Sequence, residues 1–351
     1  MAAQVAAPPP PPPAARLLDL LFGYQRTQLL HAAAELGLAD LLAAGPRPLA
    51  ELAAATTTHA PSLARLLRAL AAHGLFAERE DGQFETTPLA ALLQAGTPDS
   101  LSAMVLAEGG DFYPLWGDLL HSVRTGETAF AHLHGMSNWE YRERHPEVND
   151  RFNAYMGDLT RQKVAAVLAH HRFPDAGLLV DVGGGDGTLL AAVLRDYPGL
   201  RGVLFDLPHV AEGATARFAA AGVADRCAVA GGDFFAAVPA GGDRYVLSTV
   251  LHDWDDEHAA ALLRQCRRAM AATARLLVIE RVLPEDNSSP VGRLRDLHML
   301  VANAGGRERT AGEWRAVLAD GGFRLDALTS AGPAYHVLEA SPVEHGPPHS
   351  G

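Results

Sequence analysis

A glycine-dense turn near the middle of the chain constrains the fold more than any other feature. Residues 178–190 read LLVDVGGGDGTLL: an apolar run, then Gly183, Gly185 and Gly187, then apolar residues again. This order predicts a strand, a tight turn and a helix. Glycine leaves the backbone bare where a ligand must lie against it, and the next helix begins with unpaired N–H groups. In open α/β sheets, ligands bind at this place, at the carboxyl ends of the strands.

The spacing of the glycines distinguishes between ligand classes. A dinucleotide fingerprint, G-x-G-x-x-G, would need a third glycine where Thr188 stands, so an NAD-linked dehydrogenase is disfavoured. The spacing is instead D-x-G-x-G-x-G, with Asp181 ending the strand. It resembles the signature of S-adenosylmethionine (SAM)-dependent methyltransferases. SAM has no pyrophosphate, but it carries an ammonium, a carboxylate and a sulfonium, and an acid at the strand end suits its cationic part.

Composition and charge narrow the range of partners. The chain has 351 residues and a formal net charge of −12, which argues against nucleic acid or an anionic membrane as a partner. Its two cysteines, Cys227 and Cys266, do not have the spacing of metal ligands, and we expect a reducing cytoplasm. No apolar run approaches the ~20 residues that a membrane span needs, and the N-terminus lacks the pattern of a signal peptide.

The first hundred residues predict a small helical domain with a wing. Six consecutive prolines indicate an irregular, disordered tail over 1–15. Over 16–100, helical patterns lead to a hairpin signal at Asp81-Gly82, which is a winged-helix arrangement. Positions 1–100 hold six arginines, no lysine and nine acidic residues, so they offer no basic stripe for DNA. We therefore expect a dimerisation domain, in which the apolar helix from Arg16 onward packs on a second subunit.

The rest of the chain alternates between helix and strand patterns. Residues 101–175 are helical and lead into the glycine-dense turn, so we expect a linker that lines the active site. Over 176–341 the alternation predicts an α/β fold with a doubly wound, Rossmann-like parallel sheet and a final antiparallel hairpin. Residues 342–351 read as a disordered tail. Strands are expected at 178–181, 202–206, 227–230, 245–250, 276–280, 323–328 and 335–339.

The second and third of these strands end in residues suited to an adenosine group. Asp206 follows the second strand, and a carboxylate there accepts hydrogen bonds from both ribose hydroxyls. Asp233 follows the third strand and can accept from an adenine amino group, while Phe234 can pack on the adenine face.

The fourth and fifth strands end in groups suited to proton transfer. His252 follows the fourth strand, and a histidine titrates near neutral pH, so it can take a phenolic proton. Glu280 ends the fifth strand, at the same sheet edge. A carboxylate from Glu280 or Glu308 against the imidazole would fix its tautomer and stabilise its cation.

Together these motifs give the chain a specific resemblance. From about Arg16 to Glu339 it resembles the metal-independent, homodimeric O-methyltransferases. These include plant caffeate-type enzymes and bacterial enzymes that methylate aromatic polyketides and antibiotics. The matching stretches are DVGGGDG, FDLP, GGDFF, LHDWDDE and GGRERT.

The resemblance implies a role for each matching position. It makes His252 the catalytic base, with Glu280 and Glu308 as the two acids beside it. Ser248 is a departure, because many members carry there a basic residue that contacts the cofactor. The cofactor-binding set is Asp181, Gly183, Gly185, Asp206, Leu207, Asp233, Phe234, Ser248 and Trp254. The substrate-binding set is Phe152, Met156, Asp253, Met299 and Asn303.

We therefore expect SN2 transfer of a methyl group from SAM to a hydroxyl, most simply a phenolic one, of an aromatic small molecule in secondary metabolism. No metal is expected to take part. Two alternatives stay open. The chain can be a relative that binds SAM for non-methylating chemistry, of the hydroxylase or decarboxylase type. It can also be a winged-helix module that senses a ligand.

Overall fold

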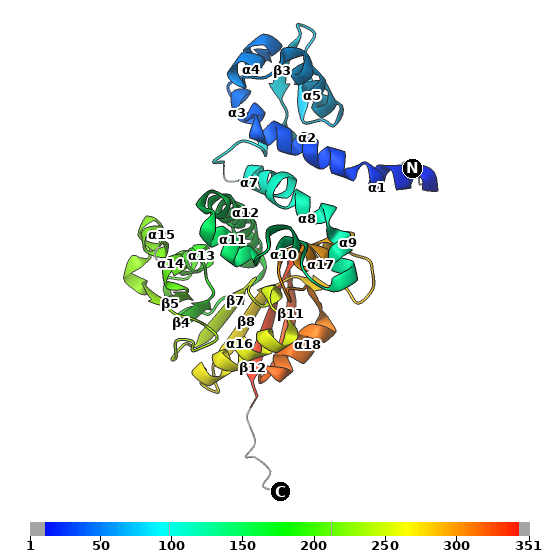
Figure 1. Cartoon of the computed structure of the whole chain (residues 1–351). Helices are drawn as coiled ribbons and strands as arrows, with labels where there is room; N and C mark the ends of the chain where they lie inside the picture. Colours follow the sequence, from blue (N-terminus) through cyan, green and yellow to red (C-terminus); the bar gives the residue numbers. More distant parts are fainter. Residues whose placement is uncertain (1–10, 98, 212, 344–351) are drawn as a thin grey trace, which may run out of the picture. The chain divides into compact units, whose positions relative to one another are not determined.

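The computed structural model in Figure 1 describes residues 11–97, 99–211 and 213–343. The chain forms two compact units, residues 1–114 with 147–158 and residues 115–146 with 159–351. The long helix α12 (Pro146–His170) contributes its first half to one unit and its second half to the other. Within the described ranges, no helix has the length and apolar character needed to cross a membrane.

The first unit consists of short helices and a three-stranded sheet. The sheet has the order β1-β3-β2, with β1 (Arg47–Pro48), β2 (Phe76–Glu78) and β3 (Gln83–Thr86). The helices are α1 (Pro13–Leu21), α2 (Gly23–Glu35), α3 (Leu38–Leu41), α4 (Leu49–Ala55), α5 (Ala60–Ala72), α6 (Pro88–Ala91), α7 (Ser102–Leu106), the π-helical turn η1 (Ala107–Asp111) and the start of α8 (Tyr113–Gly117).

The predicted hairpin is present in this unit. β2 and β3 pair antiparallel, with Phe76 opposite Thr86, and Gly82 turns the chain with a φ of +77°. The wing packs on the preceding helices through a buried cluster that includes Leu67, Leu70, Phe76 and Phe84. The predicted order of helices followed by a hairpin is therefore confirmed. It was based on the apolar periodicity of the helices and on the turn signal of Asp81-Gly82.

Two details of the N-terminal segment differ from expectation. Helix α1 begins at Pro13, so the last three residues of the predicted tail are helical; proline is tolerated there because the first helical N–H has no partner anyway. Residues 11 and 12 have no regular structure, and residues 1–10 lie outside the described residues. The continuous helical pattern after Arg16 is divided into α1, α2 and α3, and Gly37, with a φ of +59°, separates the last two.

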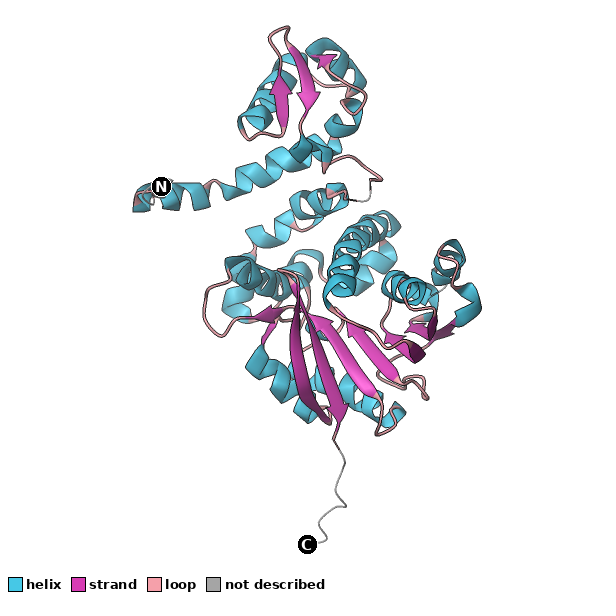
Figure 2. Ribbon diagram, turned by 180° about the vertical axis from the view of Figure 1, so that it is seen from behind, coloured by secondary structure: helices cyan, strands magenta, loops and turns pink. Residues whose placement is uncertain are grey.

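The second unit is built on a seven-stranded sheet in the order β11-β12-β8-β7-β4-β5-β6. The five strands from β8 to β6 run parallel. β12 is antiparallel to β8, and β11 is antiparallel to β12, so β11 runs in the same direction as the five. Figure 2 shows these strands side by side. Their bounds are β4 (Ala176–Val182), β5 (Gly199–Asp206), β6 (Cys227–Gly231), β7 (Arg244–Ser248), β8 (Arg275–Glu280), β11 (Phe323–Ala331) and β12 (Tyr335–Pro342).

Helices cover both faces of this sheet. Leu276 and Val278 of β8 belong to one buried cluster, and Leu277 and Ile279 belong to the other, as the period of two requires. In Figure 1, α16 and α18 lie side by side against the sheet. The helices are α9 (Leu119–Thr125), α10 (Ala129–His134), α11 (Asn138–Arg144), α13 (Thr188–Asp196), α14 (Pro208–Ala211), α15 (Ala214–Ala220), α16 (Asp256–Ala269), α17 (Pro290–Ala302) and α18 (Ala311–Asp320), with single 3-10 turns η2 (Ala224–Arg226) and η3 (Leu251–Asp253).

The fourth predicted strand is shorter than expected. We predicted it to continue to residue 250, but β7 ends at Ser248. Thr249 adopts a φ of +55°, which turns the chain out of the sheet. The reason lies on the next strand, where the buried carboxylate of Glu280 accepts hydrogen bonds from the backbone N–H groups of Val250 and Leu251. A side chain on β8 thus takes up the donors that a longer β7 would have used.

Candidate active site

The glycine-dense turn connects β4 to α13, as predicted. Gly183, Gly185 and Gly187 all have φ between +59° and +77°, a region that favours glycine. A Cβ on Gly185 would meet no heavy atom within 4 Å, whereas a Cβ on Gly184 would lie 2.3 Å from Leu204 Cδ1. Gly184 is therefore required for packing, and Gly185 presents bare backbone to open space.

Asp181 is the buried acid beneath this turn. It is 1% exposed, and within the described part of the chain neither carboxylate oxygen has a hydrogen-bond partner. Burial raises its pKa to about 7, against the opposing effect of Lys163. A buried acid with two free oxygens is costly unless a ligand supplies a donor or a cation. The ammonium of SAM is such a group, so the residues present fit the expected cofactor.

Asp206 lies at the end of β5, beside the same turn. Its Oδ2 accepts a hydrogen bond from Gly185 N–H (2.8 Å), and its Oδ1 accepts from Leu207 N–H (2.7 Å). Burial raises the pKa of this carboxyl, and the two backbone donors lower it. Each oxygen keeps a second lone pair, so the carboxylate can still accept hydrogen bonds from two ribose hydroxyls.

An aromatic group follows at the end of β6. Phe234 lies edge-on to Trp254, with ring centroids 6.2 Å apart, and its Cε1 would be 3.7 Å from a Cβ on Gly183. Asp233 Oδ1 accepts a hydrogen bond from Phe235 N–H. Ser248, at the end of β7, has a buried hydroxyl oxygen without a partner among the described residues. Phe234 thus lies beside the turn, and the adenosine site stays a prediction.

His252 lies in η3, immediately after the Thr249 turn. Its Nδ1 is 3.5 Å from Glu308 Oε1 and 3.7 Å from Glu280 Oε2, while its Nε2 is 3.7 Å from Asp253 Oδ1. Glu280 and Glu308 are buried, and the histidine side chain keeps 16% exposure. The structure therefore brings the three predicted catalytic side chains together, at ion-pair distances rather than at those of formed hydrogen bonds.

The carboxylates control the charge of the histidine. Burial alone would lower the pKa of His252, but Glu280, Asp253 and Glu308 outweigh it and raise the pKa to about 10. Burial also raises the pKa of Glu280 and of Asp253. Without ligands, the imidazole is therefore protonated at neutral pH. The two glutamates face Nδ1 and stabilise the proton on that nitrogen.

Glu308 reaches the site through a pairing that we did not predict. β9 (Val282–Leu283) and β10 (Arg309–Thr310) form a two-stranded parallel sheet, with Arg309 opposite Val282. This pairing places Glu308 beside Arg281, whose Nε is 3.7 Å from Glu308 Oε1. Arg309 is fully buried and donates to the backbone oxygens of Leu251 and Trp254, so it also fixes the segment that carries His252.

Asp253 is held on the other side of the histidine. Its Oδ1 accepts a hydrogen bond from Asn303 Nδ2 (2.8 Å), and Asn303 Oδ1 accepts one from Asn138 Nδ2 (3.0 Å). Arg142 on α11 faces the same carboxylate; burial lowers the pKa of its guanidinium to about 10, and Asp253 raises it. Asp253 and Asn303 were predicted as substrate-pocket residues, and the structure shows them bonded to each other beside His252.

The structure places one of the other predicted substrate residues, Met299, close to the histidine segment. Met299 on α17 is buried, and a Cβ on Gly306 would touch Met299 Cε, Asn303 Cβ and the backbone oxygen of His252, so these groups lie close together. Phe152 and Met156 lie on the half of α12 that belongs to the first unit. Their place near the transferred methyl group stays a prediction.

Among the described residues, two groups of side chains have the composition of a metal site. Donor atoms of His252, Glu280 and Glu308 lie within 4.8 Å of one another, but Glu280 Oε1 is engaged by backbone N–H groups and Glu308 faces the cation of Arg281. The second group is Asp118, His121 and His132. The two imidazoles there stack at 3.7 Å with planes 7° apart, so they do not aim in-plane lone pairs at a common ion. That no metal takes part stays a prediction.

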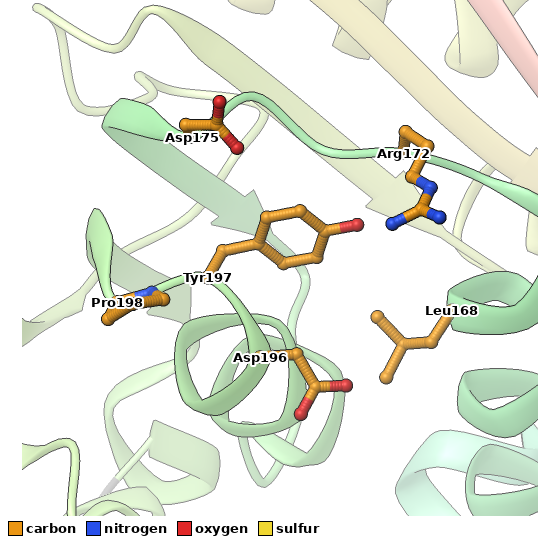
Figure 3. Close-up of a pocket in the computed structure, with 6 residues that line it drawn as sticks. All are labelled: Leu168, Arg172, Asp175, Asp196, Tyr197 and Pro198. Carbon is orange, nitrogen blue, oxygen red and sulfur yellow. The ribbon is translucent and has the colours of Figure 1, made fainter.

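A separate pocket of about 400 Å³ lies at the opposite end of the sheet. Asp175 and Pro198 line it, and they directly precede β4 and β5, so it opens at the amino ends of these strands. Figure 3 shows the Tyr197 ring in this pocket, with Arg172 and Leu168 beyond its hydroxyl end. The predicted site residues follow the carboxyl ends, so this pocket is not part of the candidate site.

Sequence reasoning missed several residues of the site, among them Asn138, Lys163 and Arg309. Asn138 and Lys163 are on helices α11 and α12 and enter the site from outside the strand ends that guided the prediction. Arg309 belongs to the GGRERT stretch, where its neighbour Glu308 drew attention. The signal available for Lys163 was its rarity, since it is the only lysine in the chain.

Comparisons with known proteins show the family of the chain. Residues 116–324 match the model of the O-methyltransferase domain, and residues 18–96 match that of the O-methyltransferase dimerisation domain. The chain is 47% identical to the phenazine O-methyltransferase PhzM of Lysobacter antibioticus over 93% of this chain and 96% of that protein. It is 40% identical to the 3-amino-4-hydroxybenzoate 4-O-methyltransferase of Streptomyces cremeus over 93% of this chain and 89% of the relative.

Solved structures give the same result. The crystal structure of human N-acetylserotonin methyltransferase in complex with SAM matches with a TM-score of 0.86 and 30% identity, over 95% of this chain and 99% of that one. The glycine-dense turn, the strand-end acids and the acid-flanked histidine thus occur in a chain that matches the domain models and these relatives. The chain belongs to the SAM-dependent O-methyltransferase family and carries that family's dimerisation domain.

Proposed function

We propose that this enzyme moves the methyl group of SAM to a phenolic hydroxyl of an aromatic small molecule, with His252 as the general base. The observation that carries the proposal is the environment of His252. Its Nδ1 faces two buried carboxylates, while the side chain keeps 16% exposure. This arrangement suits a histidine whose Nε2 accepts a proton and whose cation the acids then stabilise.

The aromatic acceptor is supported by what the relatives act on. One relative is named for a phenazine, and the other for the 4-hydroxyl of 3-amino-4-hydroxybenzoate. Both molecules are aromatic, and the second is a phenol. We infer an acceptor of the same class, and a role in secondary metabolism such as antibiotic biosynthesis.

The cofactor set would work by holding SAM against bare backbone. Bound SAM supplies a methyl group on a sulfonium, which is a good leaving group. Asp181 would pair with the ammonium, Asp206 would accept from the ribose, and Asp233 with Phe234 and Trp254 would hold the adenine. Because the leaving group is already activated, orientation contributes much of the rate, on the order of 7–11 kcal/mol for well-placed reactants.

The proton step would fall to His252. Since its pKa is raised to about 10 in the ligand-free protein, the imidazole must lose its proton before it can act as a base. Nε2 then takes the proton of the acceptor hydroxyl as the oxygen–carbon bond forms. Glu280 and Glu308 hold the ring through Nδ1 and stabilise the resulting imidazolium.

A ligand titration with product analysis tests this function. Melting temperature is followed with SAM, with its demethylated product and with NAD; we expect the first two to raise it and NAD to have no effect. Hydroxylated aromatics, including 3-amino-4-hydroxybenzoate and a hydroxyphenazine, are then incubated with the enzyme and SAM. The masses of the products are measured by mass spectrometry. Products that gain one methyl group support the proposal, whereas SAM binding with gain of one oxygen or loss of carbon dioxide would favour non-methylating chemistry.

Two further expectations belong here. We infer a cytoplasmic enzyme, because both cysteines are free thiols, with Cys266 buried in the core. The ligand-sensing alternative has little support, since the helix α5 of the winged unit has only Arg65 and Arg68 as basic side chains, and Arg68 is paired with Glu78.

A further inference from the structure

Lys163 is a buried cation that the mechanism above does not use. It is the only lysine of the chain, lies on the second half of α12 and is 4% exposed. Its ammonium donates hydrogen bonds to Thr249 Oγ1 (2.6 Å) and to Ser248 O (3.5 Å). Both acceptors are uncharged oxygens at the end of β7. A buried ammonium without a directly bonded anion is unfavourable, so its presence calls for a reason.

The charges around Lys163 come from the two neighbouring strands. The sheet order is β8-β7-β4, and the ammonium faces Glu280 at the end of β8 and Asp181 on β4. Asp186 also favours the charged lysine, and Arg281 opposes it. Burial is the largest effect and lowers the lysine pKa to about 8. Lys163 thus lies between the acid of the cofactor turn and an acid of the histidine cluster.

The hydrogen-bond acceptor of Lys163 has a strained backbone. Thr249 has a φ of +55°, which is rare for a β-branched residue. Its hydroxyl receives the lysine N–H, and its own N–H donates to Ile279 O on β8. The next two N–H groups are held by Glu280 Oε1, and His252 follows directly. The turn in front of the histidine is therefore fixed by Lys163 on one side and Glu280 on the other.

We propose that Lys163 is a positioning residue of methyl transfer: its ammonium holds the Thr249 turn that places His252, and its charge balances that of Glu280. This inference rests on the proposed role of His252 as the base. It assigns two separable effects to one side chain, a geometric effect through Thr249 and an electrostatic effect through Glu280.

The electrostatic effect predicts different pH profiles for two lysine variants. Lys163 has the lower pKa, about 8 against about 10 for His252, so the lysine has already lost its charge where the imidazole of the unmodified enzyme titrates. Lys163→Arg keeps a positive charge at that pH, so it should favour loss of the imidazole proton and move the acid limb of kcat/KM to lower pH, whereas Lys163→Met should leave the limb in place. The acceptor is any phenol that the unmodified enzyme methylates. An acid limb at the same pH in both variants would overturn the electrostatic part.

The geometric effect is tested with Thr249→Val. This variant keeps the lysine and the β-branched shape but removes the hydroxyl acceptor. We expect kcat to fall at least several-fold at all pH values, with the acid limb unmoved, while Thr249→Ser recovers most of the rate. Turnover of Thr249→Val equal to that of the unmodified enzyme would overturn the positioning role.

A measurement that needs no turnover completes the test. Because the chain has one lysine, selective ¹³C,¹⁵N-lysine labelling gives a single side-chain NMR signal. We expect its titration midpoint well below that of free lysine, ~10.4, and lower still in Glu280→Gln, where a stabilising anion is lost. A midpoint unchanged in Glu280→Gln would refute the coupling. Failure of the base proposal would appear separately, as unchanged turnover in His252→Ala.

Discussion

At the scale of single residues, the histidine and its three acids determine when the enzyme can act. Nδ1 of His252 faces Glu280 and Glu308, Nε2 faces Asp253, and the pKa of the ring is raised to about 10. Charged groups next to this set are Arg142, Arg281 and Lys163. The same acids that stabilise the imidazolium during proton transfer therefore also keep the free base scarce near neutral pH.

This balance predicts the effect of Glu280→Gln on pH dependence. A raised histidine pKa means that kcat/KM increases with pH until the imidazole is neutral, because this parameter reports the free enzyme. Removing the charge of Glu280 lowers the histidine pKa, so the acid limb should move to lower pH, while the maximal rate falls. The measurement is kcat/KM from pH 6 to about 10.5, a window that spans the ordinary and raised histidine pKa.

Glu257→Gln is the matched control for this change. It removes the same charge from an exposed position in the first turn of α16, away from the imidazole. Its profile should overlay that of the unmodified enzyme. An acid limb that stays fixed in Glu280→Gln, or moves equally in both variants, would contradict the electrostatic role of Glu280.

At the scale of elements, the site depends on the turn between β4 and α13. Gly185 has a φ of +59° and faces open space. In Gly185→Ala, the strained backbone should cost about 1 kcal/mol of folding stability, and the new methyl group would enter the space proposed for SAM. We expect a lower melting temperature and at least a tenfold weaker SAM affinity, both measurable by calorimetry.

Gly82→Ala separates these two effects. Gly82 has a φ of +77° in the hairpin of the first unit, and a Cβ there also meets no atom within 4 Å. It should therefore cost similar stability and leave SAM affinity unchanged. Equal SAM affinity in the two alanine variants would mean that the glycine-dense turn does not contact the cofactor.

Elements with strong local signals could be predicted from the sequence. Apolar runs predicted the parallel strands. Asp206 and Glu280 could be chosen as site residues because they are acids at strand ends, and parallel strands end at one edge of the sheet. The end of β7 was placed two residues late, since the turn at Thr249 depends on the distant side chain of Glu280. Asn138 and Lys163 come from helices, whose packing over the sheet has no local signature.

At the scale of the whole molecule, the chain combines a dimerisation domain with a catalytic domain. Helix α1 exposes an unusual number of large apolar side chains, and Leu17 and Leu20 are 68% and 77% exposed. Exposed apolar surface of this kind indicates a partner. The enzyme is a homodimer, and we infer that α1 forms part of the contact.

A pair of charge insertions tests this assignment. The double variant Leu17→Asp, Leu20→Asp should sediment as a monomer at micromolar concentration, because charged residues at the centre of an apolar interface are strongly unfavourable. Ala15→Asp adds one acid at another exposed position of the same helix and should stay dimeric. A double variant that remains fully dimeric would place the interface elsewhere.

The central claim is that His252 removes the acceptor proton while other residues hold SAM. The most direct measurement is SAM affinity and methyl-transfer turnover of His252→Ala, side by side with the unmodified enzyme, on a phenol that the latter methylates. The account predicts unchanged affinity and a turnover lower by about 10²–10⁴-fold, the range of general-base catalysis. Turnover that survives the substitution, or that falls only in step with SAM affinity, would contradict it.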